Sequence, residues 1–268
     1  MAETTTKDSR IISILITHWG MNEQRSEIMR KSLLSLLPTI KKLPVELIVV
    51  DNGENFDDSQ FLLAMAHNGE INTYIRNHKN LSFGYARNQA LRVCNGDFIA
   101  VCDNDIRYYG GWLESCLKVL DAHPDKKIWA TPVYNVAHWL PKYWSNEVLE
   151  VDEEIYKLNS RAGSNCWVMR RKDFEEVGEF LIHRVAGTKW TEEAIQKGYL
   201  GAVTPKLMVD DMSFREGYQI NKAIPIKETL SNGEEVYYNQ DEFKSDNGGL
   251  NYSREKRFNP KARIRFQE

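Results

Sequence analysis

The chain has 268 residues, of which 42% are hydrophobic and 27% are charged, and its formal net charge is −3. This length allows a sizeable buried core in one large domain, with or without an appendage. The weakly acidic balance excludes a general attraction to nucleic acid or to anionic membranes. The apolar run at residues 11–16 is too short for a signal-peptide core or a membrane span, so we expect a cytoplasmic protein without a transmembrane segment.

Short apolar runs alternate with amphipathic runs through the first half of the chain. The pattern predicts strands at residues 11–17, 45–50, 71–75, 98–102 and 127–131, and helices at 23–37, 59–67, 83–93 and 111–122. Such alternation favours βαβ units around a largely parallel sheet. Beyond residue 132 the alternation is lost, and we expect a strand at 165–170 followed by helices at 172–177 and 191–197.

The four cysteines form no C-x-x-C pair and fall within predicted strands or helices or directly at the end of one. This placement predicts reduced thiols in the core rather than a zinc site or disulfides. The residues are Cys94, Cys102, Cys116 and Cys166.

Residues 98–105, Phe-Ile-Ala-Val-Cys-Asp-Asn-Asp, are an apolar run of strand length that stops at two acids. Alternate residues of an extended backbone point the same way, so Asp103 and Asp105 can present both carboxylates at the open end of a sheet. Such oxygen ligands suit Mn²⁺ or Mg²⁺, with waters and phosphates completing the shell. Acids after strands also cap helices and form turns, so the motif alone leaves both interpretations open.

Two other predicted strands also end in polar residues. The first ends at Thr17, His18 and Trp19, and the second ends at Asp51, Asn52 and Gly53. We expect these ends to lie with the paired acids along one edge of the sheet. The chain has no G-x-x-x-x-G-K-[ST] phosphate loop, and the turn after the first strand lacks the glycines of a dinucleotide fingerprint.

Read in order, several segments resemble family 2 glycosyltransferases of the GT-A fold. They are T-H-W-G at 17–20, V-V-D-N-G at 49–53, N-L-S-F-G-Y-A-R-N-Q-A-L at 80–91, G-D at 96–97 before the D-x-D, G-W-L at 111–113, G-S-N at 163–165, R-R at 170–171 and F-E-E-V-G at 174–178. The resemblance covers about residues 10–215. It implies an α/β fold of GT-A type, with a Rossmann-like, mixed but mainly parallel sheet flanked by helices.

The resemblance also implies a division of the chain and a set of donor contacts. A GT-A domain would span residues 1–220, with about 10–130 holding the nucleotide sugar and 131–220 the acceptor. Asp51 would read the nucleobase beside the backbone of Thr17, His18 and Trp19, although a carboxylate there is also a common loop cap. The other donor-binding candidates are Asn80, Arg87, Asn88, Asp103 and Asn104, with Arg87 suited to a diphosphate or to a helix-surface ion pair.

Asp103 would contact the ribose or share the metal, and Asp105 would bind the metal directly. Family members often complete the metal shell with a late histidine, and Asp210 and Asp211 stand in its place here. A carboxylate is a chemically sound substitute toward Mg²⁺ or Mn²⁺.

The family pattern fails at the catalytic base. The usual Glu-Asp pair before the Gly198 helix end is replaced by Ala186 and Gly187. Glu192 and Glu193 are the nearest acids, and either would serve as the base unless both belong to a charged helix face.

Four further positions are candidates for contact with the acceptor or the sugar: Trp139, Gly163, Ser164 and Trp190. Trp139 lies in the aromatic-rich stretch 129–144, which favours either core packing or a platform for stacking a sugar ring.

Together these features predict a metal-dependent, inverting glycosyltransferase that moves a sugar from a nucleotide diphosphate donor, with UDP-sugar favoured, to an acceptor hydroxyl. Two alternatives stay open: a sugar-phosphate nucleotidyltransferase, which usually needs a glycine-rich basic loop that residues 18–22 do not supply, and a non-catalytic nucleotide-sugar-binding domain. The acceptor is open among a glycan, a lipid-linked glycan, a polyanionic polymer and modified DNA. The polar, Gly-containing and basic segment 221–268 suits a mobile lid or a tail.

Overall fold

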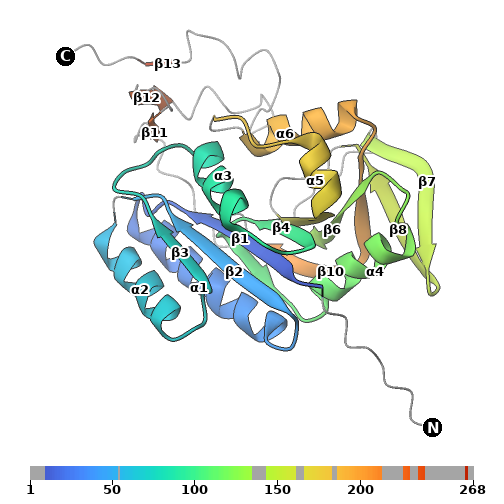
Figure 1. Ribbon diagram of the computed structural model, residues 1–268, viewed down its shortest axis with the longest axis horizontal. Coiled ribbons are helices and arrows are strands. Elements are labelled where there is room, and N and C mark those ends of the chain that lie inside the picture. Colours follow the sequence, from blue (N-terminus) through green and yellow to red (C-terminus); the bar gives the residue numbers. More distant parts are fainter. Residues whose placement is uncertain are drawn as a thin grey trace.

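A computed structural model describes residues 10–53, 55–134, 143–160, 166–182, 186–212, 226–229, 235–238 and 263–264. The first half alternates strands and helices (Figure 1): β1 (Ile12–His18), α1 (Glu23–Ile40), β2 (Val45–Asp51), α2 (Phe56–His67), β3 (Thr73–Arg76), α3 (Phe83–Val93) and β4 (Phe98–Cys102). The second half contains β5 (Ile106–Tyr108), α4 (Trp112–Ala122), β6 (Ile128–Tyr134), β7 (Trp144–Val151), β8 (Glu154–Asn159), β9 (Cys166–Arg170), α5 (Arg171–Val177), α6 (Ala186–Gln196) and β10 (Leu200–Asp211).

One large mixed sheet organises the described part of the chain. Its strand order is β3-β2-β1-β4-β9-β6-β10-β8-β7, and β5 pairs with β10 beside this path. The four strands β3, β2, β1 and β4 are mutually parallel. β4 then pairs antiparallel with β9, which places the strand before the two acids at the centre of the sheet.

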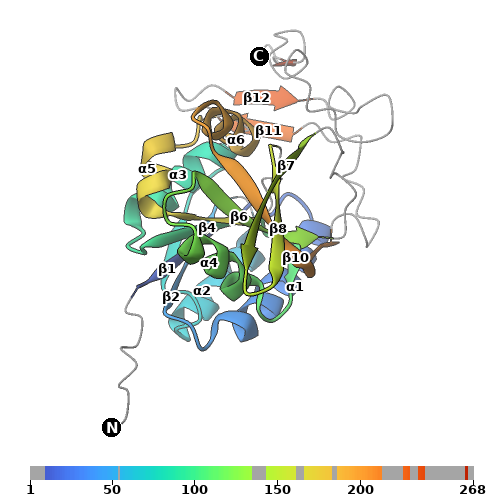
Figure 2. The same ribbon diagram turned by 90° about the vertical axis from the view of Figure 1, so that its right-hand side faces the viewer.

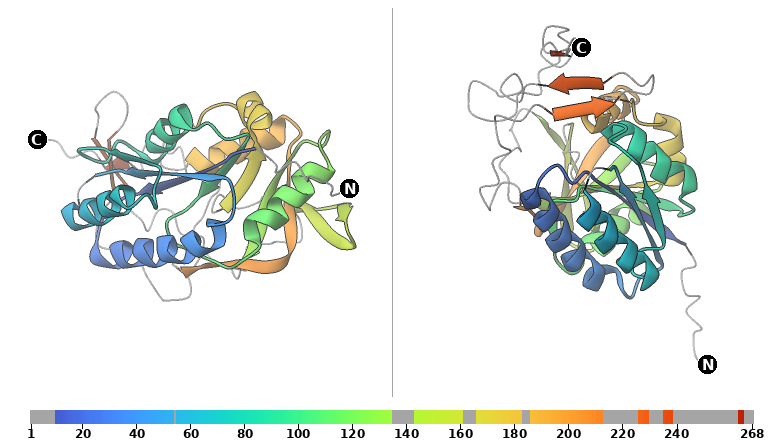
Figure 3. Two further views of the ribbon diagram at one scale, coloured as in Figure 1. Left: turned by 60° about the horizontal axis from the view of Figure 1, so that its bottom comes forward. Right: turned by 90° about the vertical axis from the view of Figure 1, so that its left-hand side faces the viewer.

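Two hydrophobic layers enclose the sheet, and the period-two alternation of the strands assigns side chains to them. Ile12, Ile14 and Ile16 pack with α1, α2 and α4 on one face, whereas Leu15 packs with α3, α5 and α6 on the other. Figure 3 shows the two groups of helices on opposite sides of the sheet.

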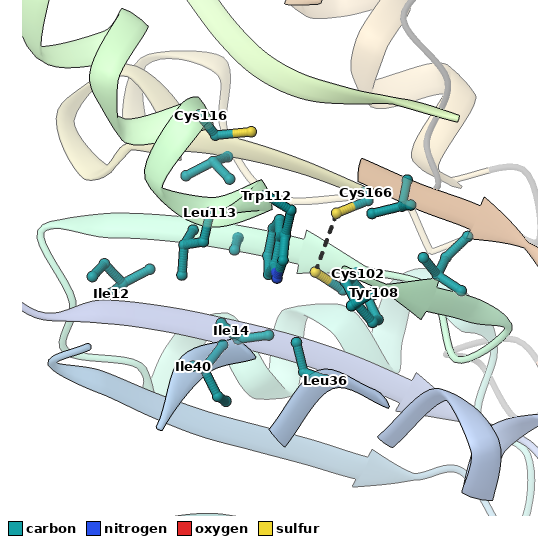
Figure 4. Close-up of a cluster of buried hydrophobic side chains, with 14 of the residues drawn as sticks. Ile12, Ile14, Leu36, Ile40, Cys102, Tyr108, Trp112, Leu113, Cys116 and Cys166 are labelled. Atoms are coloured by element: carbon teal, nitrogen blue, oxygen red, sulfur yellow. Dashed lines mark hydrogen bonds between the residues drawn. The ribbon is translucent and has the colours of Figure 1, made fainter. Parts of the chain in front are cut away.

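All four cysteines are free and buried. Cys102 of β4 and Cys166 of β9 face each other with their sulfur atoms 3.7 Å apart. Figure 4 shows this pair in the first layer, next to Trp112 of α4 and above Leu36 and Ile40 of α1.

The expected α/β fold is confirmed, and helix α3 has the predicted bounds of 83–93. Three predicted helix bounds are wrong. α1 continues through Pro38 to Ile40, α2 begins at Phe56 rather than Ser59, and α6 begins at Ala186 rather than Thr191. The extra turn of α6 carries Trp190 into the core, where its ring stacks on Trp167.

Four strands of the large sheet, β5, β7, β8 and β10, are absent from the sequence-based prediction. β7 has exposed residues over much of its length, and β10 contains Pro205 and shifts register against β6, so neither shows clean alternation. Within the predicted lid, the structure describes only β11 (Ile226–Thr229), β12 (Glu235–Tyr238) and β13 (Arg263–Ile264), which form a separate antiparallel sheet (Figure 2). The lid stays a prediction.

Candidate active site

The carboxyl ends of β1, β2 and β4 form the edge at which the candidate residues gather. In the sheet register His18 is paired with Asp51, and Ile16 is paired with Cys102. Asp103 therefore follows its strand immediately beside the polar ends of the other two. This is the edge at which open α/β sheets bind ligands.

Residues 103–105, which we call the aspartate turn, are held by three different elements. Arg87 of α3 donates to Asp103 (Nη2 to Oδ1, 2.5 Å), and Arg25 of α1 donates to Asp105 (Nη1 to Oδ2, 2.8 Å). The amide of Asn104 lies 2.7 Å from His18 Nδ1 at the end of β1. The backbone carbonyl of Asp105 also accepts from the amide of Met212. Every side chain of the turn thus has a partner outside it.

The Asp103 carboxyl lies in an environment that disfavours its charged form. Burial is the largest cause that raises its pKa, the charge of Arg87 opposes this, and Asp105 and Asp211 raise it again, to a final value of about 7. Asp211 must therefore lie close enough to act on Asp103. A divalent cation among these carboxylates would relieve their repulsion and favour the ionised form.

The carboxylates of the aspartate turn are suitable ligands for Mg²⁺ or Mn²⁺. Proteins usually hold Mg²⁺ by one or two carboxylates, with phosphates and waters as the remaining ligands. Asp103 and Asp105 are the two carboxylates suited to that role, and the charge of Asp211 acts on Asp103. Among the described residues, no three His, Cys, Asp or Glu side chains converge as a ready-made cage.

Arg87 is a buried cation with unused hydrogen-bonding capacity. Its side chain is 2% exposed, and its guanidinium lies 3.9 Å from the centroid of the Phe83 ring and 5.2 Å from that of Phe180. Nη1 is buried and has no hydrogen-bond partner among the described residues. Burial lowers the pKa of Arg87, and the charge of Asp103 opposes that shift. A buried donor of this kind is costly unless a further acceptor, such as a phosphate oxygen, reaches it.

Asp51 lies at the end of β2 with its carboxylate already hydrogen-bonded. Oδ2 accepts from the hydroxyls of Ser59 (2.5 Å) and Tyr74 (2.9 Å), and Oδ1 accepts from the amide of Gly53 (3.1 Å). Gly53 has φ 89°, and a Cβ there would lie 2.7 Å from the backbone of Lys79, so only glycine fits this turn. Burial, with the charge of Asp51, raises the pKa of Tyr74 to about 12.

Several predicted donor contacts have structural partners for their side chains. The amide of Asn88 exchanges two hydrogen bonds with the backbone of Phe180 (2.8 and 2.9 Å). Asn80 accepts from Asn52 Nδ2 (2.7 Å) within the turn that precedes α3. The side chain of His18 is fully buried. These three side chains thus have hydrogen-bond partners within the protein, and their part in donor binding stays a prediction.

Thr17 and Trp19 flank His18 at the end of β1. Thr17 is buried, and Trp19 is half-buried with its carbonyl accepting from the amide of Met21 (3.0 Å).

Neighbouring acids of β10 have different surroundings. Asp210 accepts from the Tyr109 hydroxyl (2.6 Å), whereas Asp211 acts on Asp103. Because successive residues of a strand point to opposite faces, only one of the two can face the aspartate turn. These surroundings favour Asp211 of the two, and the assignment of a metal ligand at the end of β10 stays a prediction.

The candidates for base and acceptor contact lie on α6 or outside the described residues. Glu192 accepts from Lys189 Nζ (2.7 Å), and Glu193 is half-buried one position along the helix. Trp190 is fully buried, with its ring centroid 4.6 Å from that of Trp167, so its assignment to the acceptor site is corrected to core packing. Trp139, Gly163 and Ser164 lie outside the described residues.

Two residues of the site escaped the sequence-based prediction. Arg25 holds Asp105, and Asp58 holds the buried ring of His18 (2.8 Å). Arg25 reads as an ordinary charge in the first turns of a helix, and Asp58 reads as an ordinary helix-start acid. No local signal distinguishes either from a solvated residue.

The sheet, its two helical layers and the paired acids after the central strand define a glycosyltransferase of the GT-A type. Residues 20–178 match the model of the family described as "Glycosyl transferase family 2", which is more than half of the chain. The chain therefore belongs to glycosyl transferase family 2. No curated protein sequence matches it.

Solved structures support the fold. The crystal structure of residues 1–349 of TarS from S. aureus matches at 18% identity with a TM-score of 0.55, over 77% of this chain and 62% of that one. GalNAc-T7, crystallised with UDP, GalNAc and Mn²⁺, matches at 13% identity with a TM-score of 0.59, over 76% of this chain and 44% of that one. TarS 1–349 in complex with UDP matches at 16% identity with a TM-score of 0.53, over 74% and 59% of the two chains. The chain thus spans less than two thirds of these relatives' lengths.

Within the described ranges, no helix has both the length and the apolar character needed to cross a membrane.

Proposed function

We propose that this glycosyltransferase uses a UDP-sugar and Mn²⁺ or Mg²⁺, and transfers the sugar to an acceptor hydroxyl with inversion at the anomeric carbon. The observation that carries the proposal is the aspartate turn, which brings two carboxylates and the buried Arg87 to the ligand-binding edge of the sheet, where the charge of Asp211 also acts on Asp103. A diphosphate and its cation are the ligand that such an arrangement of opposite charges would recognise.

Each residue has a distinct role in this proposal. Asp51 accepts a hydrogen bond from the nucleobase, and Asp103 and Asp105 hold the cation. Arg87 directs its free Nη1 to the diphosphate, where its charge stabilises the leaving group. A bound cation would supply Lewis-acid stabilisation of the departing diphosphate. An acidic side chain takes the proton of the acceptor hydroxyl as that oxygen attacks, and we assign this to Glu192 before Glu193.

Two neighbours are consistent with this choice of ligand. GalNAc-T7 was crystallised with UDP, GalNAc and Mn²⁺, and TarS 1–349 with UDP. Both share the fold of this chain, so we extend their nucleotide to it and, from GalNAc-T7, the metal.

Calorimetric titration of UDP, GDP, CDP and dTDP, each with Mn²⁺ and with EDTA, tests the proposal. We expect UDP to bind only with Mn²⁺, because two carboxylates facing a diphosphate otherwise repel it. Asp105→Ala should abolish binding, and the exposed Asp125→Ala should serve as a matched control that binds as wild type. UDP binding that is unchanged by EDTA would overturn the metal assignment, and release of sugar from the donor without acceptor would separate an enzyme from a binding domain.

A further inference from the structure

A buried polar network lies directly behind the aspartate turn. The His18 ring has Nε2 2.8 Å from Asp58 Oδ2 and Nδ1 2.7 Å from Asn104 Nδ2. The side chains of His18 and Asp58 are both completely buried. The ring thus connects α2 to the middle residue of the turn, across 86 positions of sequence between His18 and Asn104.

Asp58 determines which nitrogen of the His18 ring accepts a hydrogen bond. Burial raises the pKa of Asp58, but hydrogen bonds from His18 and Ser26 and the charge of Arg30 lower it overall, so the carboxylate accepts these hydrogen bonds. Nε2 must then carry the proton that it donates. Nδ1 is left as the acceptor for the amide of Asn104, which is the tautomer that this geometry requires.

The network is closely enclosed. Ser26 donates to Asp58 (2.5 Å), and Asn55 Nδ2 donates to Ser26 (3.1 Å). A Cβ at Gly20 would lie 2.5 Å from Asp58 Oδ2 and 3.2 Å from His18 Nε2. The surrounding chain therefore leaves the His18 ring little freedom to shift.

The contact of His18 with Asn104 differs from the ion pairs that Arg25 and Arg87 make with the other two residues of the turn. Arg25 and Arg87 hold the flanking carboxylates by charge, so a divalent cation would compete with both. The contact of His18 with Asn104 involves no carboxylate of the turn. Like the hydrogen bond from the Tyr108 hydroxyl to the backbone carbonyl of Asp103 (3.4 Å), it does not depend on the arginines.

We propose that Asp58 and His18 are positioning residues for the aspartate turn, and that they hold it through Asn104 in the conformation that receives the cation. The inference rests on the proposed function of the turn as a cation site. An orienting carboxylate behind a histidine commonly serves such a purpose around metal centres. Neither residue touches the cation or the donor in this proposal.

Hydrogen exchange of the metal-free protein tests the positioning without any chemistry. We expect Asn104→Ala and Asp58→Asn to speed amide exchange at residues 103–106 by roughly fivefold to tenfold, the equivalent of one net hydrogen bond, with β2 and α3 unchanged. Asp57→Asn, an exposed acid on the same helix, is the matched control and should leave exchange as in wild type. Unchanged exchange in Asn104→Ala overturns the proposal, as does a uniform increase over all segments in Asp58→Asn.

Titration of Mn²⁺ at fixed UDP tests the consequence for the cation. Asp58→Asn should raise the half-saturating Mn²⁺ concentration about 10-fold to 100-fold, while UDP affinity at saturating Mn²⁺ changes less than about twofold. His18→Gln, which keeps one donor and one acceptor, should recover most of the loss seen in His18→Leu. The double variant Asp58→Asn/Asn104→Ala should have a half-saturating Mn²⁺ concentration no higher than that of the more impaired single variant, because both substitutions act through the same chain of hydrogen bonds. Additive losses would overturn the proposal. Metal-independent UDP binding in the wild type would instead reject the proposed function, and the exchange result would still decide whether the turn is positioned.

Discussion

The two halves of the large sheet contribute very unequally to the candidate site. In the half made of β1, β2 and β4, the strands are parallel, and each ends in polar residues at the same edge. In the half made of β6 to β10, most neighbouring strands are antiparallel, so their ends alternate between the two edges. That half supplies Asp211, and α6 supplies the candidate base. Parallel strands place the carboxyl ends of several neighbours at one edge of the sheet, so their residues form a site together. Antiparallel neighbours place only every other carboxyl end at that edge.

The largest expected effect lies in the half that contributes least. Glu192→Gln should lower turnover by roughly 10² to 10⁴ with donor affinity nearly unchanged, because the acceptor hydroxyl would lose its base. Steady-state transfer measured beside UDP titration checks this. Glu193→Gln tests the second candidate for the base, on the next position of α6, and should keep transfer if Glu192 is the base. Full transfer in both variants would remove α6 from the mechanism and leave the base to another element.

Asp51→Ala tests the donor half. We expect UDP binding to weaken by about 1.5 to 3 kcal/mol, the usual loss for a hydrogen bond to a charged group. Ser59→Ala removes a partner of Asp51 and keeps the carboxylate, so it should bind UDP nearly as wild type. Calorimetry with a melting curve separates the outcomes. A variant that is unstable yet binds UDP normally in its native fraction would make Asp51 a structural cap.

Asp211→Asn and Asp210→Asn compare the two acids at the end of β10. Asp211 acts on Asp103 and Asp210 bonds Tyr109, so only the first should weaken Mn²⁺ affinity, by about tenfold. Mn²⁺ titration in the presence of UDP measures both. Equal losses would mean that the antiparallel half contributes through the stability of β10 rather than through a ligand.

The last prediction concerns the pH dependence of stability. The pKa of Tyr74 is raised to about 12, from 10.0, so the folded protein keeps a proton that the unfolded chain releases between these values. The stabilisation is complete below pH 10 and is lost as the pH rises to 12. Tyr74→Phe should therefore show a shallower fall of unfolding free energy over this window than wild type. Tyr85→Phe is the control, and denaturant unfolding at several pH values is the measurement. Identical slopes in wild type and Tyr74→Phe would show that Tyr74 does not contribute.

The same contrast explains how much the sequence could predict. The strand ends at Asp51 and Asp103 can be predicted from the local sequence, because each is an apolar run followed by an acid. Parallel pairing then places both strand ends at the same edge of the sheet. The contact of Arg87 with Asp103 spans 16 positions and needs only the placement of α3 before β4. These parts of the candidate site could therefore be predicted from the sequence.

Other features of the site and the fold depend on tertiary packing, which no short segment of the sequence indicates. His18 and Asp58 meet across 40 positions, and Asp58 occupies the first turn of a helix, where acids are common for other reasons. Trp190 looks like a cleft residue by composition, but three aromatic neighbours enclose it in the core. β10 carries a proline and shifts register, so its period is lost even though its pairing is extensive.

The paired thiols of Cys102 and Cys166 give the molecule an internal reporter of local opening. Cys102 directly precedes the aspartate turn, and the two sulfur atoms lie 3.7 Å apart in a fully buried layer. Burial raises the pKa of the Cys166 thiol well above its usual range, which disfavours its thiolate, and both sulfur atoms are shielded from solvent while β4 and β9 stay joined. The rate at which an aromatic disulfide reagent labels these thiols therefore reports how often β4 and β9 separate locally. A bound nucleotide should lower this labelling rate.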